Sequence, residues 1–186
     1  MIDPAGYLLM VRLDGVSPDV VEGVVVSERP HQPEPTAKIT IAIANLPAPA
    51  LELVLSRCTE AGAHAFHVFQ AERSVARGAK LERWGTICRE AAMLAGRLRI
   101  PSVDALSSLD DVLKASDHVV MLVRNAPQAL AGLTQPRDLT LLVGPEGGWS
   151  ERELAAVPVK AGLGPRNLRA DTAALVGLAV ALASRE

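Results

Sequence analysis

The sequence predicts an α/β fold with a mainly parallel sheet and helices on both of its faces. Apolar runs of strand length alternate with longer segments in which apolar residues recur at helical spacing. Turns rich in glycine and proline separate the two kinds of segment. Hydrophobic residues make up 49% of the 186-residue chain and aromatic residues only 3%, so the core must be built mostly from aliphatic side chains.

The N-terminal part, residues 1–36, is expected to be a small β unit followed by a linker. Segments 7–13 and 20–26 are strand candidates, and an Asp-Gly pair at 14–15 is a turn signal between them. They would pair as a short β-hairpin, which is marginal in water and must lean on another part of the chain. Residues 28–36 contain three prolines and are expected to form an extended linker.

Strands and helices alternate through the remainder of the chain. The clearest helix is expected at 79–97, because its apolar residues recur at helical spacing. Gly62 is a candidate C-cap for the first helix, and Asn167 is a candidate N-cap for the last. Strands are expected at 38–43, 65–69, 118–123, 139–143 and 159–163; helices are expected at 49–61, 79–97, 109–115, 151–157 and 169–184; and 126–133 is expected to be a helix or a loop.

A glycine-rich loop, GPEGGWS at 144–150, follows the strand expected at 139–143 and precedes a helix start at Ser150. Open α/β sheets bind ligands at this place, and glycine allows a ligand to lie directly on the backbone. The loop lacks the P-loop ending, the dinucleotide-binding spacing and any Lys or Arg of its own. It therefore suits a ligand held by backbone groups and shape. The plain alternative is a tight turn, although Glu146 between two glycines is a pattern that a turn does not need.

A second candidate ligand-binding segment, residues 163–169, contains a Gly-Pro turn that leads into the last helix. Free N–H groups at a helix N-terminus can bind acceptor atoms of a ligand. Arg166 and Arg169 suit a phosphate or a carboxylate. The alternative is that both arginines are only solvated and that Asn167 only caps the helix.

Together, GPEGGWS at 144–150 and LGPRNLRADTAAL at 163–175 resemble the signature of the RsmE family of SPOUT methyltransferases. Shorter blocks at 59–62, 72–75 and 90–97 agree with the same family. Its members methylate N3 of a uridine in small-subunit ribosomal RNA. The resemblance runs from about Lys38 to the C-terminus. It implies a SPOUT-like methyltransferase domain over residues 37–186 with a C-terminal trefoil knot, an exception to the rule that chains do not thread loops.

The resemblance also implies S-adenosyl-L-methionine as the cofactor, a homodimer, and an active site near the subunit interface. The cofactor would lie bent among three loops. Arg169 is the candidate for stabilising negative charge on the uracil oxygens, and Glu146 is the candidate for positioning the cofactor or acting as a base. The expected cofactor-binding residues are Val123, Gly144, Glu146, Gly147, Gly148, Leu163, Gly164, Asn167, Leu168 and Arg169, and the expected RNA-binding residues are Arg73, Arg97 and Arg166.

Two of the chain's departures from the family pattern favour a different function. Members usually carry an N-terminal PUA-like β-barrel, whereas residues 1–36 are expected to form only a reduced remnant and linker. Leu94 and Ala95 stand where the family has Gln-Ser. These departures leave open a non-catalytic RNA- or ribosome-associated factor that keeps the knotted fold. A small-molecule-binding α/β domain unrelated to RNA is a third interpretation, which would require the double motif match to be accidental.

Composition and motifs argue against several other classes of protein. The net charge of −2 does not indicate a strongly basic nucleic-acid binder, although a local basic patch is compatible with it. No metal site is expected: the histidines form no HExxH motif, and His64 and His67 have no third ligand in view. No signal peptide is recognised, and the longest apolar stretch, 173–184, is too short to span a bilayer. A cytoplasmic protein acting on ribosomal RNA is therefore expected, with no membrane association.

Overall fold

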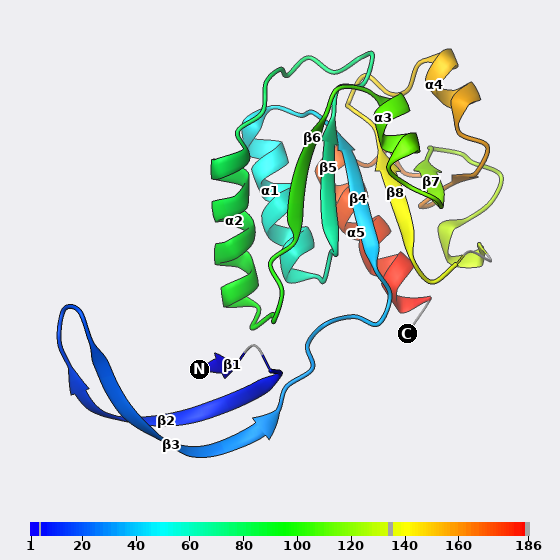
Figure 1. The fold of residues 1–186 in the computed structure, drawn as a ribbon. Coiled ribbons are helices and arrows are strands. Elements are labelled where there is room, and N and C mark those ends of the chain that lie inside the picture. The colour runs from blue at the N-terminus through cyan, green and yellow to red at the C-terminus, as the bar shows by residue number, and fades with distance from the viewer. Residues whose placement is uncertain (4, 134–135, 185–186) are drawn as a thin grey trace.

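The computed structural model describes residues 1–3, 5–133 and 136–184 of the chain. The unit predicted over 37–186 therefore includes four residues, 134–135 and 185–186, that lie outside the described part. The described residues form two sheets, one antiparallel at the N-terminus and one parallel in the main body (Figure 1).

The parallel sheet has the strand order β6-β5-β4-β8-β7-β9, and all of its pairings are parallel. This confirms the predicted α/β class with a mainly parallel sheet. The central strand β8 is buried along its whole length, as expected for a continuous apolar run between two layers of helices. The strands are β4 (Ile39–Ala44), β5 (Ala65–Phe69), β6 (Ser102–Leu106), β7 (Val119–Leu122), β8 (Leu139–Val143) and β9 (Lys160–Ala161).

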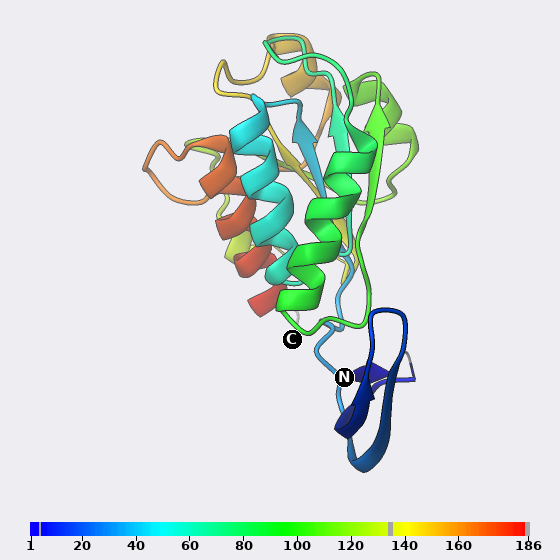
Figure 2. The same cartoon turned by 90° about the vertical axis from the view of Figure 1, so that its left-hand side faces the viewer.

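Helices cover both faces of this sheet, as predicted. On one face α1 (Ala48–Glu60), α2 (Leu81–Leu94) and α5 (Ala170–Ala183) lie side by side (Figure 2), over a core that includes Ile41 and Leu141. On the other face α3 (Leu109–Lys114) and α4 (Glu151–Ala156) adjoin a smaller core around Phe69, Met121 and Leu142. Neighbouring residues such as Leu141 and Leu142 belong to different cores because side chains alternate across a strand.

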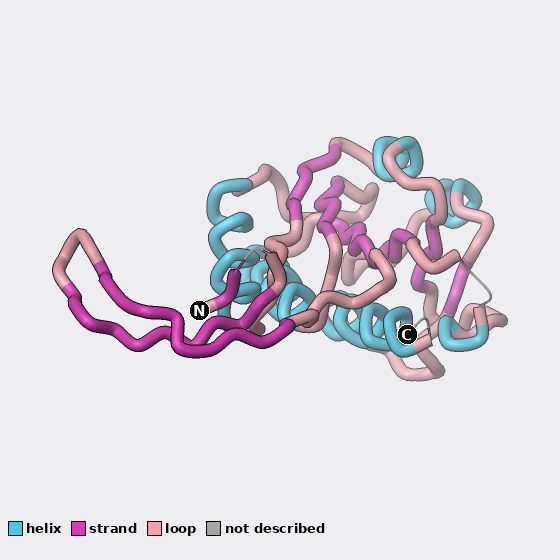
Figure 3. The backbone as a smooth tube through the Cα atoms, turned by 60° about the horizontal axis from the view of Figure 1, so that its bottom comes forward, coloured by secondary structure: helices cyan, strands magenta, loops and turns pink. Residues whose placement is uncertain are grey.

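The N-terminal sheet contains β1 (Ile2–Asp3), β2 (Tyr7–Val16) and β3 (Val21–Pro30), all paired antiparallel. Its two long strands extend away from the main body (Figure 3), and every residue of β3 is exposed. The predicted Asp-Gly turn at 14–15 is wrong. A register shift between Leu13 and Gly15 absorbs the extra residue, and the chain turns instead at Ser17, whose N–H donates to the carbonyl oxygen of Val20 at 2.8 Å.

The predicted linker, 28–36, is shorter than expected because β3 continues to Pro30. The rest of it is attached to the main body. The ring nitrogen Nε2 of His31 lies 2.7 Å from the carbonyl oxygen of Gly96. The carboxylate of Glu34 accepts hydrogen bonds from the guanidinium of Arg97 and from the amides of Leu98 and Arg99.

Other element boundaries differ from the prediction in detail. Strand β6 was not predicted. Helix α2 is shorter than 79–97, because Gly96 has a left-handed φ of 67° and Ala95 is already the C-cap. The segment at 126–133 contains only the short 3₁₀-helix η1 (Leu130–Gly132). Asn167 is not the N-cap of α5; that position is Arg169, and its side chain makes no capping hydrogen bond.

Candidate functional site

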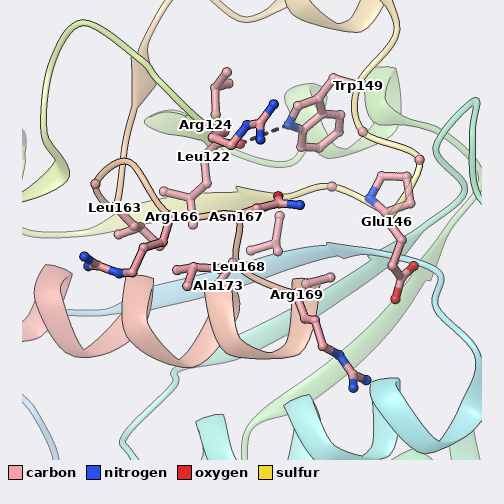
Figure 4. Close-up of a pocket in the computed structure, with 18 residues that line it drawn as sticks. Leu122, Arg124, Glu146, Trp149, Leu163, Arg166, Asn167, Leu168, Arg169 and Ala173 are labelled. Carbon is pink, nitrogen blue, oxygen red and sulfur yellow. Dashed lines mark hydrogen bonds between the residues drawn. The ribbon is translucent and has the colours of Figure 1, made fainter.

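A cleft of about 470 Å³ opens at the carboxyl ends of β7 and β8, beside the N-terminus of α5 (Figure 4). Three segments far apart in the sequence line it. They are residues 122–124 at the end of β7, residues 143–149 at the end of β8, and residues 163–164 and 166–170 at the start of α5, with Ala173 further along that helix. The carboxyl edge of a parallel sheet is where α/β proteins place ligands, so the fold brings the two motifs to an expected position.

The loop after β8 approaches its neighbours too closely for larger residues. A Cβ atom added to Gly144 would lie 2.9 Å from the indole ring of Trp149, and one added to Gly147 would lie 3.3 Å from Cβ of Arg73. Gly148 has a φ of 69°, and Gly164 in the third segment has a φ of 98°, both in the left-handed region. These glycines allow the backbone itself to form the wall of the cleft.

Trp149 joins two of the three segments. Its indole Nε1 donates a hydrogen bond to the carbonyl oxygen of Leu122 at 3.0 Å. The ring stacks on Phe69 with a centroid distance of 6.3 Å and an interplanar angle of 8°. Its place in the loop was visible in the sequence, but its role in positioning that loop was not predicted.

Ser150 ends the loop and caps α4, as predicted. Its hydroxyl accepts a hydrogen bond from the N–H of Glu153, and the carboxylate of Glu153 accepts one from the N–H of Ser150. This capping box fixes where the loop stops and the helix begins.

Charged side chains surround the cleft on several sides. In Figure 4 Arg124 lies on the same side as Trp149, whereas Glu146 and Arg169 extend in the opposite direction. The guanidinium Nε of Arg169 lies 3.4 Å from Oδ1 of Asp171, and its side chain is 73% exposed. Both Glu146 and Arg169 are thus available to a ligand that reaches this edge.

The structure brings all ten predicted cofactor-binding residues to this one cleft. Arg166, expected to contact RNA, also lines it. Arg73 lies outside the lining, but its Nη1 donates to the carbonyl oxygen of Gly147 at 3.2 Å. The lining residues that were not singled out from the sequence are Leu122, Arg124, Val143, Pro145, Trp149, Ala170 and Ala173.

Arg97 requires a correction. Its side chain is only 4% exposed and lies 2.6 Å from the carboxylate of Glu34. Its Nη1 donates to the carbonyl oxygens of Thr59 and Ala63. The guanidinium is therefore committed to the attachment of the linker and is not available to RNA, so the assignment of Arg97 to RNA binding is wrong.

Two histidines and two cysteines with shifted pKa values lie outside the lining of the cleft. Burial lowers the pKa of His64 and His67 below the ordinary value of 6.5, so both are neutral at pH 7. Burial raises the pKa of the Cys58 thiol to about 12 and also raises that of Cys88. None of these groups is placed to exchange protons with a ligand in the cleft.

Between residues 1 and 184, with the gaps stated above, no group of three or more His, Cys, Asp and Glu side chains could hold a metal ion. In the same part of the chain, every helix is too short or too polar to cross a membrane.

Comparison with known proteins gives the class of this fold and cleft. Residues 32–182 match the family described as "RNA methyltransferase domain". That range contains all three segments that line the cleft, so the domain is of the RNA methyltransferase class.

Individual relatives narrow this class. The chain is 32% identical to "Ribosomal RNA small subunit methyltransferase E" of Bacillus subtilis, over 93% of this chain and 76% of that protein. It is 39% identical to the protein of the same name in Mycobacterium bovis, over 68% of this chain and 56% of that protein. The chain belongs to the ribosomal RNA small subunit methyltransferase E family.

A solved structure agrees. The Neisseria gonorrhoeae member of this family, crystallised with S-adenosyl methionine, superposes with a TM-score of 0.85 at 26% identity. The match covers 96% of this chain and 79% of that one. The likeness extends over nearly the whole chain and is therefore not confined to the motifs.

Proposed function

We propose that the protein transfers a methyl group from S-adenosyl-L-methionine to N3 of a uridine in small-subunit ribosomal RNA. The observation that carries this proposal is the convergence of both signature motifs, from 144–150 and 163–169, on one cleft. Membership of the family and the cofactor bound by the Neisseria gonorrhoeae relative support it.

The residues of the cleft suit the cofactor. The cleft has a volume of about 470 Å³, which lies within the range of about 300–1,000 Å³ that is usual for small-molecule sites. Apolar side chains such as Leu122, Leu163 and Leu168 offer a surface for the adenine ring, and the glycine-rich loop offers backbone polar groups. When bound, S-adenosyl-L-methionine supplies an electrophilic methyl group on a sulfonium. Val123, Gly144, Glu146, Gly147, Gly148, Leu163, Gly164, Asn167, Leu168 and Arg169 would hold it.

The chain's own contribution to the reaction would be alignment and charge stabilisation. Uracil N3 must lose its proton before or as the methyl group arrives, and this puts negative charge on the ring oxygens. Arg169, an exposed cation at the start of α5, would stabilise that charge. Glu146 would position the cofactor or accept the proton. Correct orientation of N3 toward the methyl group would supply a large part of the rate enhancement.

Ribosomal RNA would approach along the carboxyl edge of the sheet. Arg166, at the cleft, and Arg73, against the glycine-rich loop, suit contact with RNA phosphates. In this arrangement residues 37–186 would form the methyltransferase unit and residues 1–36 a small appended β unit. A trefoil knot formed by the C-terminal loops, and a cytoplasmic location beside the ribosome, complete the proposal.

The same proposal includes a homodimer. Helix α5 is apolar nearly all round, and its outward side exposes the apolar residues Val176 and Ala179, with the polar Thr172 one turn earlier. An apolar helix face left in water favours burial against a partner, and a second copy would provide it. Gel filtration would report the dimer directly.

A non-catalytic ribosome-associated factor is the second candidate. Leu94, where the family has a polar residue, is 82% exposed and Met93 beside it is 73% exposed, so this surface offers apolar contacts instead of polar ones.

Mass spectrometry of nucleosides from small-subunit ribosomal RNA distinguishes the methyltransferase from the non-catalytic factor. A strain without the gene should lose 3-methyluridine and regain it with the native gene but not with Arg169→Ala. Retention of the modification in the deletion strain would favour the non-catalytic factor.

A further inference from the structure

Glu153 makes one more contact than a helix cap requires. In a capping box the residue at the third helical position accepts a hydrogen bond from the N-cap N–H, and one carboxylate oxygen is enough for that. Here Oε2 of Glu153 accepts from the N–H of Ser150 at 2.8 Å. The other oxygen, Oε1, accepts from the N–H of Glu72 at 3.0 Å, 81 residues earlier in the chain.

This second hydrogen bond joins the loop after β5 to the first turn of α4, which directly follows the loop after β8. Glu153 is buried, with 3% exposure; its hydrogen bond with Ser150 is buried, and the one with Glu72 is partly buried. Arg73, the residue after Glu72, donates from Nη1 to the carbonyl oxygen of Gly147 at 3.2 Å. A Cβ atom on Gly147 would lie 3.3 Å from Cβ of Arg73. The two loops are therefore in direct contact, and Glu153 fixes the main chain on both sides of that contact.

We infer that Glu153 is a positioning residue that sets Arg73 relative to the cofactor-binding loop. The inference rests on the proposed function, in which Arg73 contacts RNA and the loop at 144–148 holds the methyl donor. In that arrangement one loop holds the RNA and the other holds the methyl donor. Because Glu153 fixes these two loops relative to each other, its carboxylate determines how the target base meets the methyl group. Misplacement by about 1 Å can lower the rate on the order of a hundredfold.

The variant Glu153→Gln separates this role from helix capping. A Gln side chain still caps, since capping boxes accept Glu or Gln at this position. Its amide has only one acceptor oxygen, so with that oxygen on the Ser150 N–H its NH₂ group would face the Glu72 N–H. Ser150→Ala is the matched control, because it removes the hydroxyl of the cap and leaves both oxygens of Glu153 in place.

Methylation of ribosomal RNA by the whole protein tests the inference. We expect Glu153→Gln to lower kcat at least about tenfold through lost alignment, with cofactor affinity changed less than about threefold, and Ser150→Ala to keep most of the rate. Combining Glu153→Gln with Arg73→Ala should cost little more than Arg73→Ala alone, because coupled residues are non-additive. Equal losses in Glu153→Gln and Ser150→Ala, or additive losses in the double variant, would overturn the inference.

Hydrogen exchange keeps this test separate from that of the proposed function. Faster exchange of the Glu72 amide in Glu153→Gln, but not in Ser150→Ala, is expected even if the native protein methylates nothing. Unchanged exchange of that amide would contradict the inference whatever the enzyme activity. If Glu153→Gln does not fold, Glu153→Asp keeps the charge with a side chain too short to reach both donors, and the same comparison applies.

Discussion

The indole N–H of Trp149 donates to the carbonyl oxygen of Leu122. This hydrogen bond attaches the glycine-rich loop, which follows β8, to the end of the neighbouring strand β7. Leu122 and Trp149 both line the cleft. Their hydrogen bond sets the separation between two of the three segments that would surround the cofactor, and it is the basis of the first prediction.

Trp149→Phe should weaken cofactor binding while the protein remains folded. The variant keeps an aromatic ring against Phe69 and loses the hydrogen bond to Leu122, which is worth about 0.5–1.5 kcal/mol. We expect S-adenosylhomocysteine to bind about 2- to 10-fold less tightly by calorimetry. Trp84→Phe is the control, because Trp84 is buried in α2 away from the cleft and should affect stability alone. Equal affinity changes in the two variants would contradict the role given to Trp149.

Gly144→Ala should disturb the cleft by displacing Trp149. The new Cβ atom would lie 2.9 Å from a ring that is held by stacking and by a hydrogen bond, and overpacking of this kind costs about 1–3 kcal/mol. A lower melting temperature and weaker S-adenosylhomocysteine binding are expected. Gly85→Ala is the control, since nothing lies within 4 Å of its Cβ position and Ala is favoured in the middle of a helix. A native-like affinity in Gly144→Ala would show that Trp149 need not stay where it is.

Glu34→Ala should destabilise the protein strongly. It leaves the guanidinium of Arg97, 4% exposed, without its counter-ion. Removing one partner of a buried pair costs about 3–5 kcal/mol, and we expect the lower end because Glu34 itself is 21% exposed. Urea denaturation measures this change. Arg83→Ala, which breaks the exposed pair with Glu52, should change the midpoint little. A small effect for both would mean that the linker is held by other contacts.

The contribution of Glu34 should depend on pH. Burial opposes its ionisation, but the hydrogen bond and charge of Arg97, with the amides of Arg99 and Leu98, together hold its pKa below the ordinary 4.5. A carboxyl with a lowered folded-state pKa stabilises above the unfolded value and loses this effect as pH falls through the folded value. The stability difference between native protein and Glu34→Gln should therefore be full at neutral pH and shrink below pH 4.5. A difference that stays constant into acid would contradict the ion pair.

The sequence predicts best those helices and strands that are buried on one or both faces, because burial imposes a pattern of apolar residues on them. Strands β5 and β8 were predicted with the bounds that the structure has, because both are apolar runs enclosed by helices. Strand β6 was missed because it is the edge strand: Ser102, Asp104 and Ala105 are exposed, so its sequence carries no apolar pattern. Its pairing with β5 makes it a strand, and pairing is a tertiary property.

The candidate site was predictable where the motifs themselves form it. The features of the site that the sequence did not predict depend on contacts between residues distant in sequence. The bond from Trp149 to Leu122 spans 27 positions, and the pair of Arg97 with Glu34 spans 63. A single sequence shows that an arginine is present but not whether a carboxylate neutralises it, and for this reason Arg97 was assigned to RNA and Arg73 could not be linked to Glu153.

The central claim is that the cleft at the ends of β7 and β8 holds S-adenosyl-L-methionine. Calorimetric titration with S-adenosylhomocysteine, on the native protein, Gly147→Val and the control Gly85→Val, tests it most directly. Valine at 147 would press on Arg73, whereas position 85 is open. We expect native binding, kept in Gly85→Val and weakened at least about tenfold, or ~1.4 kcal/mol, in Gly147→Val. No binding by folded native protein, or equal binding by all three, would contradict the claim.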